Sequence, residues 1–539
     1  MLPIVLSGFM ATGKSTVGPR LAARLDLPFV DTDAAIVQGA GKSVAEIFRD
    51  EGEAGFRSRE KDLVEQLLAS PEARVLAFGG GTVTSRRLRH YALDRALVVT
   101  LSASPETVLE RVAQTGGRPL LAGADPRARA CELLEARADA YAECHLSLVT
   151  DNTDPDALVD AIVALAERSP VAVPLGTRSY VVDFTRGKPT HLTDALARLG
   201  PSSLVVVDDA NVERARGGAL AAALGPLAVR SIRVTLPAGE QHKNLASVGT
   251  IWDAALGAGI DRDGVVVAFG GGVVGDLAGF ASACLLRGVR VVQVPTTLLA
   301  MVDASVGGKT GFDHASGKNL VGAFHQPSAV VIDLEHLSTL SVRERTAGLA
   351  EVVKAGLALD ATLFEALRSQ VVAVRAGDPE VLLPIVRAAV KAKARVVRDD
   401  EREGQPAGRV LLNVGHTVGH ALEAHGGYTR YLHGEAVAIG TVLELAVGAS
   451  LGITPPDLVV LARELFQSLG FAVTVSRDEL AAAWRFALAD KKRAGARLKF
   501  PVVTSLGAAR VEMVAFDVLE RALLGEGVGR FLAAARSGS

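Results

Sequence analysis

The sequence predicts an α/β fold with parallel strands in the first two thirds of the chain and a mainly helical last third. Residues 265–269 and 289–294 are apolar, β-branched runs of the kind that forms strands buried on both faces of a sheet. A glycine turn and an apolar segment that can form a helix separate the two runs, which gives the order of a βαβ unit. After Pro327 long stretches of Ala, Leu, Val and Arg dominate, and strand signals are few.

Length and composition limit the class of protein. At 539 residues the chain has room for about three or four domains of about 150 residues each. A hydrophobic content of 49% with 22% charged residues is that of a globular protein and not of a disordered one. The net charge of −2 gives no electrostatic argument for a nucleic-acid or membrane partner, and aromatic residues, at 4%, are too few for base-stacking platforms.

The sequence also bears on the location of the protein. The three cysteines, Cys131, Cys144 and Cys284, form no C-x-x-C pair, which suits a reducing compartment and excludes a cysteine zinc site. The N-terminal apolar run is too short for a signal peptide, and no run of about eighteen uncharged apolar residues could span a membrane. We therefore expect a cytoplasmic protein.

The first chemical motif follows a short apolar strand at residues 2–6. There the chain reads GFMATGKST, and Gly8, Gly13, Lys14 and Ser15 match G-x-x-x-x-G-K-[ST]. Backbone N–H groups of such a loop surround phosphates, the lysine neutralises them, and the serine hydroxyl binds Mg²⁺. Because a predicted helix at residues 16–25 follows, the motif predicts nucleotide binding.

Acids and arginines recur at the ends of the next elements. The strand PFVDTD ends in Asp31 and Asp33, which could serve Mg²⁺ or a substrate hydroxyl, cap the following helix, or do both. Arg57 lies on a probable helix in GFRSRE, Arg118 in the glycine-rich segment GGRPLL, and Arg137 on the helix after it. Taken singly, each arginine is more typical of a surface charge than of a ligand contact.

The P-loop, DTD, GFRSRE, FGGGT, GGRPLL and the arginine of EARADAY together resemble shikimate kinase, from residue 1 to about residue 167. The resemblance implies a P-loop kinase domain with a parallel sheet. It implies that ATP binds at Gly8, Met10, Ala11, Thr12, Gly13, Lys14, Ser15, Thr16 and Arg111, with Mg²⁺ at Ser15 and Asp31. It also implies that shikimate binds at Asp33, Arg57, Gly80, Gly81 and Arg137, with Lys14 and the lid arginine Arg118 catalytic.

Residues 169–176 contain Pro170, Pro174 and Gly176 between two periodic regions, and we expect a linker there. The predicted domains are thus residues 1–168, then 177–333, and finally 334–539. The strand at 204–209 ends in acids suited to a ribose. Gly270, Gly272 and Gly275 satisfy G-x-G-x-x-G, but the position where that motif places its acid is apolar, so Asp209 could supply it instead.

Charged residues gather in a glycine-rich segment between two apolar runs. The first run ends near residue 302, and the second ends near residue 333. Asp303, Lys309, Asp313, Lys318 and Asn319 lie there without clear periodicity. Such a segment is either a solvated surface loop or a site for an anionic, polyhydroxylated ligand, since lysines attract phosphate or carboxylate and Asn and Asp bond hydroxyls.

The last third carries a candidate metal site. His416, His420, His425 and His433 account for four of the eleven histidines within eighteen positions. His416 and His420 are four residues apart, so spacing alone favours these two as ligands on one helical face. Glu351 and Lys354 are three apart and could simply form a helical ion pair.

The segments PAGEQHKN, GGGVVGDLAGF, RGVRVVQVPTTLLAMVDASVGGKTG, GKNLVGAFHQP, AEVVKAG, DERE, NVGHTVGHALE, LHGEAVAIG and DKK resemble 3-dehydroquinate synthase, from residue 184 to about residue 535. The resemblance implies an NAD-binding α/β domain followed by a mainly α-helical metal-binding domain. It implies that Zn²⁺, or another divalent ion, is bound by Glu351, His416 and His433, which leaves His420 beside the substrate.

The same resemblance implies the remaining contacts of this second unit. NAD would bind at Asp209, Glu240, Lys243, Gly271, Gly272, Val273, Asp276, Thr296, Thr297 and Lys318. The heptulosonate phosphate substrate would contact Arg287, Asp303, Lys309, Asn319, Lys354, Lys393, Arg409 and His420, of which Lys309, Lys354 and His420 would be catalytic. Arg287 would reach the phosphate from the partner subunit of a homodimer.

One segment departs from this resemblance, and one choice between two lysines stays open. Between DERE and NVGHT the chain reads GQPAGR, which is longer than the usual short glycine turn, and either Lys491 or Lys492 could face the ligand. We expect a bifunctional enzyme of aromatic amino acid biosynthesis that phosphorylates shikimate and forms 3-dehydroquinate. The alternative is a metal-dependent polyol dehydrogenase joined to a P-loop module that only senses nucleotide.

Overall fold

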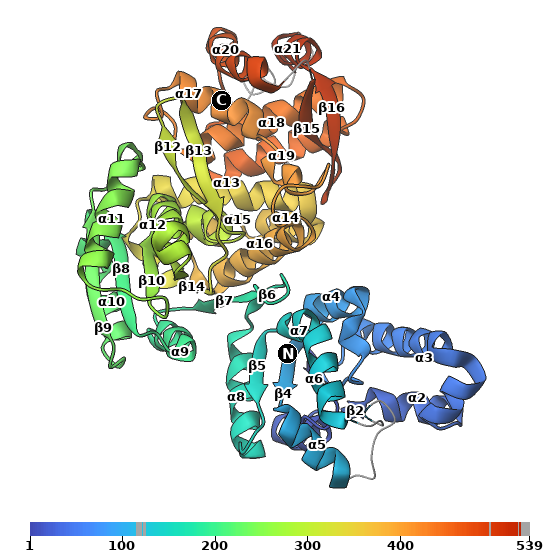
Figure 1. Cartoon of the computed structure of the whole chain (residues 1–539). Coiled ribbons are helices and arrows are strands. Elements are labelled where there is room, and N and C mark those ends of the chain that lie inside the picture. The colour runs from blue at the N-terminus through green and yellow to red at the C-terminus, as the bar shows by residue number, and fades with distance from the viewer. Residues whose placement is uncertain (115–120, 122–124, 495–496, 526–527, 530–539) are drawn as a thin grey trace. The chain divides into compact units, whose positions relative to one another are not determined.

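The computed structural model describes residues 1–114, 121, 125–494, 497–525 and 528–529 (Figure 1). The chain divides into two compact units, Met1–Asp183 and Phe184–Ser539. Residues 171–173, within the predicted linker, form the strand β6 (Val171–Val173). Among the described helices, none is long and apolar enough to cross a membrane.

The first unit is built on a five-stranded parallel sheet with the P-loop strand at its centre. The strand order is β2 (Phe29–Asp31), β3 (Val75–Ala77), β1 (Ile4–Ser7), β4 (Leu97–Ser102) and β5 (Leu146–Val149). Its helices are α1 (Lys14–Leu25), α2 (Thr32–Ala40), α3 (Val44–Ala69), α4 (Arg86–Arg95), α5 (Pro105–Gln114), α6 (Pro126–Ala136), α7 (Ala138–Ala142) and α8 (Pro155–Arg168), with the short 3-10 helix η1 (Thr82–Thr84).

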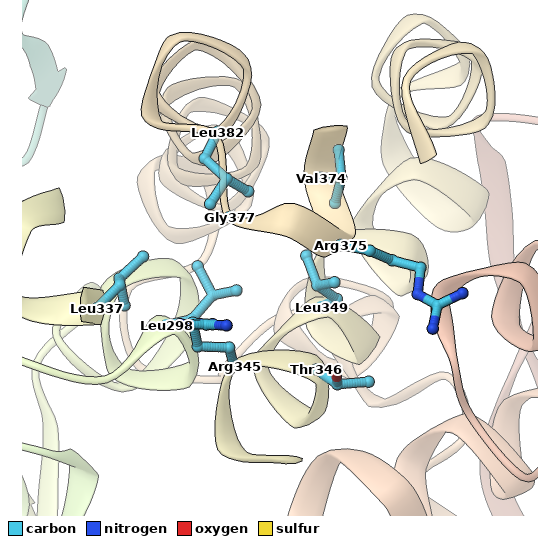
Figure 2. A pocket seen from close by; sticks show the side chains of 9 residues that line it. All are labelled: Leu298, Leu337, Arg345, Thr346, Leu349, Val374, Arg375, Gly377 and Leu382. Atoms are coloured by element: carbon cyan, nitrogen blue, oxygen red, sulfur yellow. The ribbon is translucent and has the colours of Figure 1, made fainter. Parts of the chain in front are cut away.

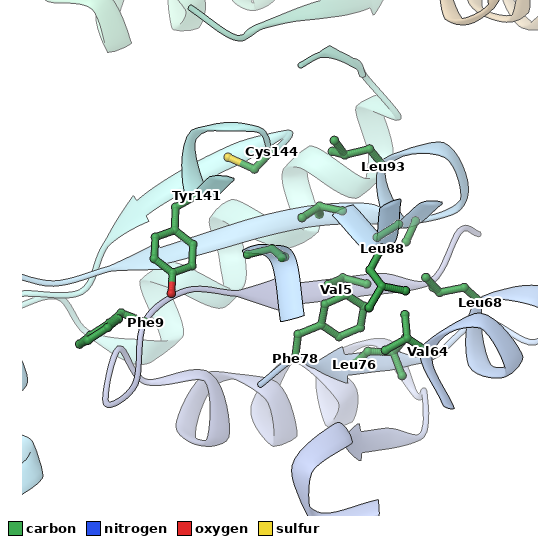
Figure 3. Packing of buried hydrophobic residues seen from close by; sticks show 14 of the residues in the cluster. Val5, Phe9, Val64, Leu68, Leu76, Phe78, Leu88, Leu93, Tyr141 and Cys144 are labelled. Carbon is green, nitrogen blue, oxygen red and sulfur yellow. The ribbon is translucent and has the colours of Figure 1, made fainter. Parts of the chain in front are cut away.

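Alternate side chains of the central strand enter two separate cores, because successive strand residues point to opposite faces of a sheet. Val5 packs with Phe78, Val64 and Leu68 in one core (Figure 3). Its neighbours Ile4 and Leu6 pack in the other core, where α1 and α8 contribute. Both faces are therefore covered, as a parallel sheet requires.

The second unit contains most of a seven-stranded sheet. The strand order is β6, β7 (Tyr180–Thr185), β14 (Ala329–Asp333), β11 (Arg290–Pro295), β10 (Val265–Gly270), β8 (Ser203–Asp209) and β9 (Arg230–Leu236). Strands β14, β11, β10, β8 and β9 run parallel, and β6 pairs antiparallel with β7. The helices of this part are α9 (Thr190–Leu199), α10 (Ala210–Leu224), α11 (Leu245–Gly257) and α12 (Gly272–Cys284).

The rest of the second unit is mainly helical, as the sequence predicts. Its helices are α13 (Val342–Leu359), α14 (Ala361–Ser369), α15 (Val371–Ala376), α16 (Pro379–Asp399), α17 (His416–His425), α18 (His433–Ser450), α19 (Pro456–Leu469), α20 (Arg477–Ala494) and α21 (Phe516–Leu524) (Figure 1). A hairpin of β15 (Arg497–Ser505) and β16 (Ala508–Ala515), which the sequence analysis does not predict, lies among them.

The charged, glycine-rich segment after residue 302 is also more regular than expected. It contains a π-helical turn, η5 (Ala300–Ala304), and a hairpin of β12 (Lys309–His314) and β13 (Gly317–Phe324). Most of β13 is exposed. Alternation of apolar and polar residues marks a strand with one buried face, and β13 has no such face for the sequence to reveal. The hairpin nevertheless places Lys309, Lys318 and Asn319 on an ordered element.

Candidate active sites

The P-loop leaves the central strand β1 and leads directly into α1. Gly8 has φ +134° and a Cβ there would lie 2.1 Å from the Leu101 carbonyl oxygen, so no other residue fits this first turn. Lys14 Nζ donates to the carbonyl oxygens of Gly8 at 2.8 Å and of Phe9 at 2.7 Å, which holds its charge over the loop. Arg111 donates to the Ala11 carbonyl oxygen at 3.1 Å and thereby braces the same loop.

Asp31 performs the local role that its position at the end of β2 predicts. Its Oδ1 accepts from the backbone N–H groups of Asp33 at 3.0 Å and Ala34 at 3.2 Å, which caps α2. Its Oδ2 accepts from Ser15 Oγ at 3.4 Å. One carboxylate thus caps a helix and faces the P-loop serine, so the structural and the metal-binding interpretations are compatible.

A glycine turn at residues 79–81 brings the predicted shikimate residues together. A Cβ on Gly79 would lie 2.5 Å from Asp33 Oδ1, and a Cβ on Gly81 would lie 2.5 Å from Arg57 Nη2. Arg137 Nη1 donates to the carbonyl oxygen of Gly80 at 3.3 Å. A carboxylate and two guanidinium groups therefore surround one turn.

The same turn lies beside the P-loop. A Cβ on Gly80 would stand 3.4 Å from the backbone nitrogen of Met10. The polar group around residues 79–81 and the phosphate-binding loop are therefore neighbours, as transfer of a phosphoryl group between two substrates requires.

Glu60 is a residue of this site that the sequence analysis did not identify. Its buried carboxylate accepts from Arg57 Nη1 at 2.7 Å and from Thr82 Oγ1 at 2.6 Å. Burial opposes the charge on Arg57, but Glu60 raises the guanidinium pKa above its ordinary value. Glu60 follows Arg57 by three residues on α3, and this helical spacing is the signal that could have revealed it. Arg118 lies outside the described residues.

In the second unit, the predicted NAD residues lie at the ends of three adjacent parallel strands. Asp209 ends β8, Gly271 and Gly272 follow β10, and Thr296 and Thr297 follow β11. Because β8, β10 and β11 pair in parallel, these residues share one edge of the sheet. The carboxyl edge of a parallel sheet is where dinucleotides bind.

Two lysines join this edge to the β12–β13 hairpin. Lys243 Nζ lies 2.7 Å from Asp276 Oδ2 and donates to Asn319 Oδ1 at 2.6 Å. Burial disfavours the charge on Lys243, yet Asp276 holds its pKa above the ordinary value. Lys318 Nζ lies 2.7 Å from Glu240 Oε1. The hairpin and the carboxyl edge are therefore held together by charge.

A candidate metal centre forms where α13, α17 and α18 meet. The ligand atoms of Glu351, His416 and His433 lie within 4.8 Å of one another. Glu351 Oε1 is 3.7 Å from His416 Nε2 and 3.6 Å from His433 Nε2. Two histidines and one carboxylate with open positions form the donor set of a catalytic zinc site.

Electrostatics also fit a bound cation at this centre. Glu351 Oε1 is buried and has no hydrogen-bond partner among the described residues. Burial opposes the carboxylate charge, but Lys354 and the two histidines hold the Glu351 pKa well below its ordinary value. A buried, ionised oxygen without a donor beside two imidazoles is the arrangement that a divalent cation satisfies.

A second group shares His433. His420, Glu423 and His433 also lie within 4.8 Å of one another, and Glu423 Oε2 is 3.2 Å from His433 Nδ1. Burial opposes protonation of His433, yet the neighbouring carboxylates of Glu351 and Glu423 raise its pKa to about 10. Neither group contains both His416 and His420, so the pair that spacing alone favours is not the one that the geometry supports. Glu423, three residues after His420, is a further residue that helical spacing could have revealed.

Close approach of the three helices makes this geometry possible. A Cβ on Gly434 would lie 1.8 Å from the Ala347 carbonyl oxygen of α13, and a Cβ on Gly440 would lie 2.1 Å from that of Gly415. Glu444 of α18 accepts from the backbone N–H groups of Gly415 at 2.7 Å and Val418 at 3.0 Å. The turn that presents His416 is thus anchored to the helix that presents His433.

Each of three lysines predicted for the substrate site pairs with a carboxylate. Lys354 pairs with Glu351, Lys309 pairs with Glu403, and Lys393 Nζ lies 2.5 Å from Asp303 Oδ1. Burial lowers the Lys393 pKa below its ordinary value in spite of Asp303.

Two further arginines predicted for this site differ in exposure. Arg409 is 1% exposed and donates to the carbonyl oxygens of Glu401 at 2.9 Å and Gly307 at 2.8 Å. Arg287, in contrast, is exposed and has φ +68°.

Comparison with known proteins matches both halves of the chain. The models "3-dehydroquinate synthase N-terminal" and "3-dehydroquinate synthase C-terminal" match residues 233–347 and 348–493. The 3-dehydroquinate synthase of Geobacter metallireducens is 44% identical over 338 residues, 62% of this chain and 93% of that protein. The chain belongs to the 3-dehydroquinate synthase family. The model "Shikimate kinase" matches residues 10–167, so the chain joins a shikimate kinase to the synthase.

Other relatives agree with this assignment. The 3-dehydroquinate synthase of Gloeobacter violaceus is 42% identical over 359 residues, 66% of this chain and 98% of that protein. The structure of the 2-epi-5-epi-valiolone synthase ValA from Streptomyces hygroscopicus, with NAD⁺ and Zn²⁺ bound, is 30% identical with a TM-score of 0.58 and covers 65% of this chain and 96% of that one. The relatives named 3-dehydroquinate synthase disfavour the polyol dehydrogenase alternative.

A separate apolar pocket of the synthase does not contribute to these sites. It lies along α13 and is lined by Leu298, Leu337, Arg345, Thr346, Leu349, Val374, Arg375, Gly377 and Leu382 (Figure 2). None of these lining residues belongs to the predicted site of the synthase.

Metal titration of the apo chain, with a chromophoric chelator as competitor, can show which of the two groups that share His433 binds the metal. The first group also contains Glu351 and His416, and the second also contains His420 and Glu423. We expect Glu351→Gln to weaken Zn²⁺ binding by more than about 100-fold, beyond the roughly 10- to 100-fold loss expected for Glu423→Gln, which only orients a ligand. His420→Ala should change the affinity by less than about threefold, because His420 is outside the first group. A loss for His420→Ala as large as that for His416→Ala would place the metal in the second group instead.

Proposed function

We propose that this bifunctional chain phosphorylates shikimate with its first 168 residues and converts 3-deoxy-D-arabino-heptulosonate 7-phosphate to 3-dehydroquinate and phosphate with residues 177–539. The synthase part would comprise an NAD-binding domain at 177–333 and a metal and substrate domain at 334–539. The two reactions belong to aromatic amino acid biosynthesis. The three free cysteines suit a location in the cytoplasm.

For the kinase, the proposal rests on the turn at residues 79–81, which adjoins the P-loop and collects Asp33, Arg57 and Arg137. Guanidinium groups match the carboxylate of shikimate, and Asp33 can accept from a hydroxyl group. On the other side, Lys14 and the P-loop amides hold the phosphates, and Ser15 with Asp31 would hold Mg²⁺. The phosphoryl group can pass directly from ATP to the shikimate hydroxyl without a covalent enzyme intermediate, because positioning and charge neutralisation supply most of this catalysis.

For the synthase, the proposal rests on Lys318, which connects the two halves of the site. Its Nζ lies 2.7 Å from Glu240 Oε1 on the NAD side and 4.0 Å from Glu423 Oε1 on the metal side. A cofactor at the sheet edge and a metal at Glu351, His416 and His433 would therefore act on one substrate.

When bound, NAD⁺ would supply a hydride acceptor and Zn²⁺ a Lewis acid for a secondary alcohol of the substrate. Lys309, Lys354, Lys393 and Arg409 would supply positive charge for the phosphate and carboxylate groups of the substrate. Glu351 and Asp303 keep two of these lysines in place. His420 lies beside the metal group without belonging to it and is available to accept or donate a proton.

The exposed position of Arg287 supports a homodimer in which this side chain reaches the phosphate site of the other protomer. Arg287 belongs to a short 3-10 helix, η4 (Leu285–Arg287), whose last two residues both have positive φ. This backbone is costly for residues other than glycine, and a contact outside the protomer would justify it.

The kinase assignment predicts a contrast between two arginines of the same helix. Arg57 faces the 79–81 turn, whereas Arg59 is bonded to Glu51 at 2.9 Å on the outer side. Arg57→Ala should raise the KM for shikimate by about 10- to 100-fold, because a charged hydrogen bond to the carboxylate is lost. Arg59→Ala should leave it within twofold. Shikimate-dependent ADP release measures both, and it should disappear in Lys14→Ala.

Equal values of the shikimate KM in Arg57→Ala and Arg59→Ala would contradict the proposed pocket. Continued nucleotide binding without shikimate turnover in the unaltered chain would instead indicate a sensor module.

The homodimer proposal predicts subunit complementation in the synthase. Arg287→Ala and His420→Ala should each abolish phosphate release from the heptulosonate phosphate. Mixed after dissociation and reassociation, they should recover about a quarter of the unaltered activity, because random pairing gives half heterodimers with one intact site each. Activity no greater than that of the separate variants would mean that Arg287 acts within its own protomer or not at all.

A further inference from the structure

The segment that connects the two enzymes forms an ordered turn within the first unit. It consists of residues 175–179 and lies between the stretches matched by the two families, which end at residue 167 and begin at residue 233. The Gly176 N–H donates to Glu143 Oε1 at 3.0 Å, and the Thr177 N–H donates to Asp139 Oδ1 at 2.9 Å. Two successive backbone donors of the connecting turn thus bind two carboxylates of the kinase.

Hydrogen bonds within the turn hold its shape. Ser179 Oγ accepts from the Leu175 N–H at 2.9 Å and donates to the Gly176 carbonyl oxygen at 2.5 Å. Gly176 has φ +61°, and a Cβ there would lie 2.5 Å from Asp139 Oδ1. The backbone conformation therefore favours glycine, and a methyl group at this position would displace the Asp139 carboxylate.

The two carboxylates lie on and just after α7, the helix that begins directly after Arg137. Tyr141 of α7 donates from its hydroxyl to the Gly80 carbonyl oxygen at 2.6 Å, the same oxygen that accepts from Arg137. This helix has only five residues and no side-chain cap at its N-terminus. Because helices this short are unstable by themselves, its position depends on contacts from outside.

Glu143 connects these contacts to the other wall of the pocket. Its Oε2 accepts from Arg89 Nε at 2.5 Å, and Arg89 Nη1 donates to the Val83 carbonyl oxygen at 2.6 Å, just after the 79–81 turn. Arg89 and Glu143 are each 8% exposed. Burial opposes the charge on Glu143, but bonds from His90, Arg89 and the Gly176 N–H lower its pKa to about 2. The carboxylate therefore remains charged and holds all three segments.

We propose that the connecting turn is a positioning element of the shikimate pocket, which holds α7 so that Arg137 and the 79–81 turn keep the geometry that binds the substrate carboxylate. This inference rests on the proposed placement of shikimate at Arg137. The ATP side is anchored differently, since Arg111 joins the P-loop to the Thr150 carbonyl oxygen at 2.8 Å. Loss of the turn's contacts should therefore affect shikimate binding and leave ATP binding unaltered.

The test compares two glycine variants of the full-length chain. Gly176→Ala adds a methyl group against Asp139, whereas Gly41→Ala adds one at the end of α2, where φ is +64° and nothing lies within 4 Å of the Cβ. Both variants introduce the same backbone strain. Gly176→Ala should raise the KM for shikimate about tenfold, with kcat, the KM for ATP and phosphate release by the synthase within twofold of the unaltered chain. Gly41→Ala should leave all four unchanged.

Two further variants make the result decisive. Asp139→Ala removes an exposed acceptor of the turn and should raise the shikimate KM in the same way, by a few fold, even if Gly176→Ala folds poorly. Suppose that Arg137→Ala raises the shikimate KM, but that Gly176→Ala and Asp139→Ala have the same shikimate KM as Gly41→Ala. The positioning role of the turn would then be wrong, and the proposed shikimate pocket would still be supported. If Arg137→Ala has no effect on the shikimate KM, the proposed pocket is wrong, and the role of the turn falls with it.

Discussion

The buried carboxylate of Glu351 is the constraint on which the synthase half depends. An ionised oxygen in an apolar helical interior is costly unless opposite charges face it. Lys354 supplies one such charge from the same helix, and His416 and His433 approach from two other helices. The helices can come this close only because glycines line their contacts. The three helices must therefore pack closely enough to bring these charges to the Glu351 carboxylate.

In both units the candidate binding residues lie at the carboxyl edge of a parallel sheet. In the kinase, β1 lies at the centre of the sheet and is followed by the P-loop, and β3 is followed by the turn at residues 79–81. In the synthase, β8, β10 and β11 end side by side in Asp209, a glycine turn and a threonine pair. Loops at such an edge bring residues distant in sequence to one ligand. The hairpin β12–β13 then adds Lys318 from a third segment, which links the edge to the metal centre.

Local patterns allowed much of this arrangement to be predicted from the sequence. The P-loop and the βαβ unit are encoded within a few tens of residues, and the predicted metal ligands Glu351, His416 and His433 fall in motifs that identify the family. The hairpin β12–β13 was missed because its second strand is exposed and lacks an apolar period. The bonds from Arg89 and Gly176 to Glu143 join residues 54 and 33 positions apart, and no spacing rule reports such contacts. Glu60 and Glu423 lie three residues from partners that were identified, so helical periodicity could have found them.

The central claim, that a metal centre and an NAD site act together on one phosphorylated substrate, is tested most directly by phosphate release with a trace of NAD⁺. The full-length chain is assayed with the heptulosonate phosphate before and after chelation, and NADH is followed in parallel. The account predicts many turnovers per NAD⁺, loss of turnover on chelation and recovery with Zn²⁺. Stoichiometric NADH without phosphate release would contradict it.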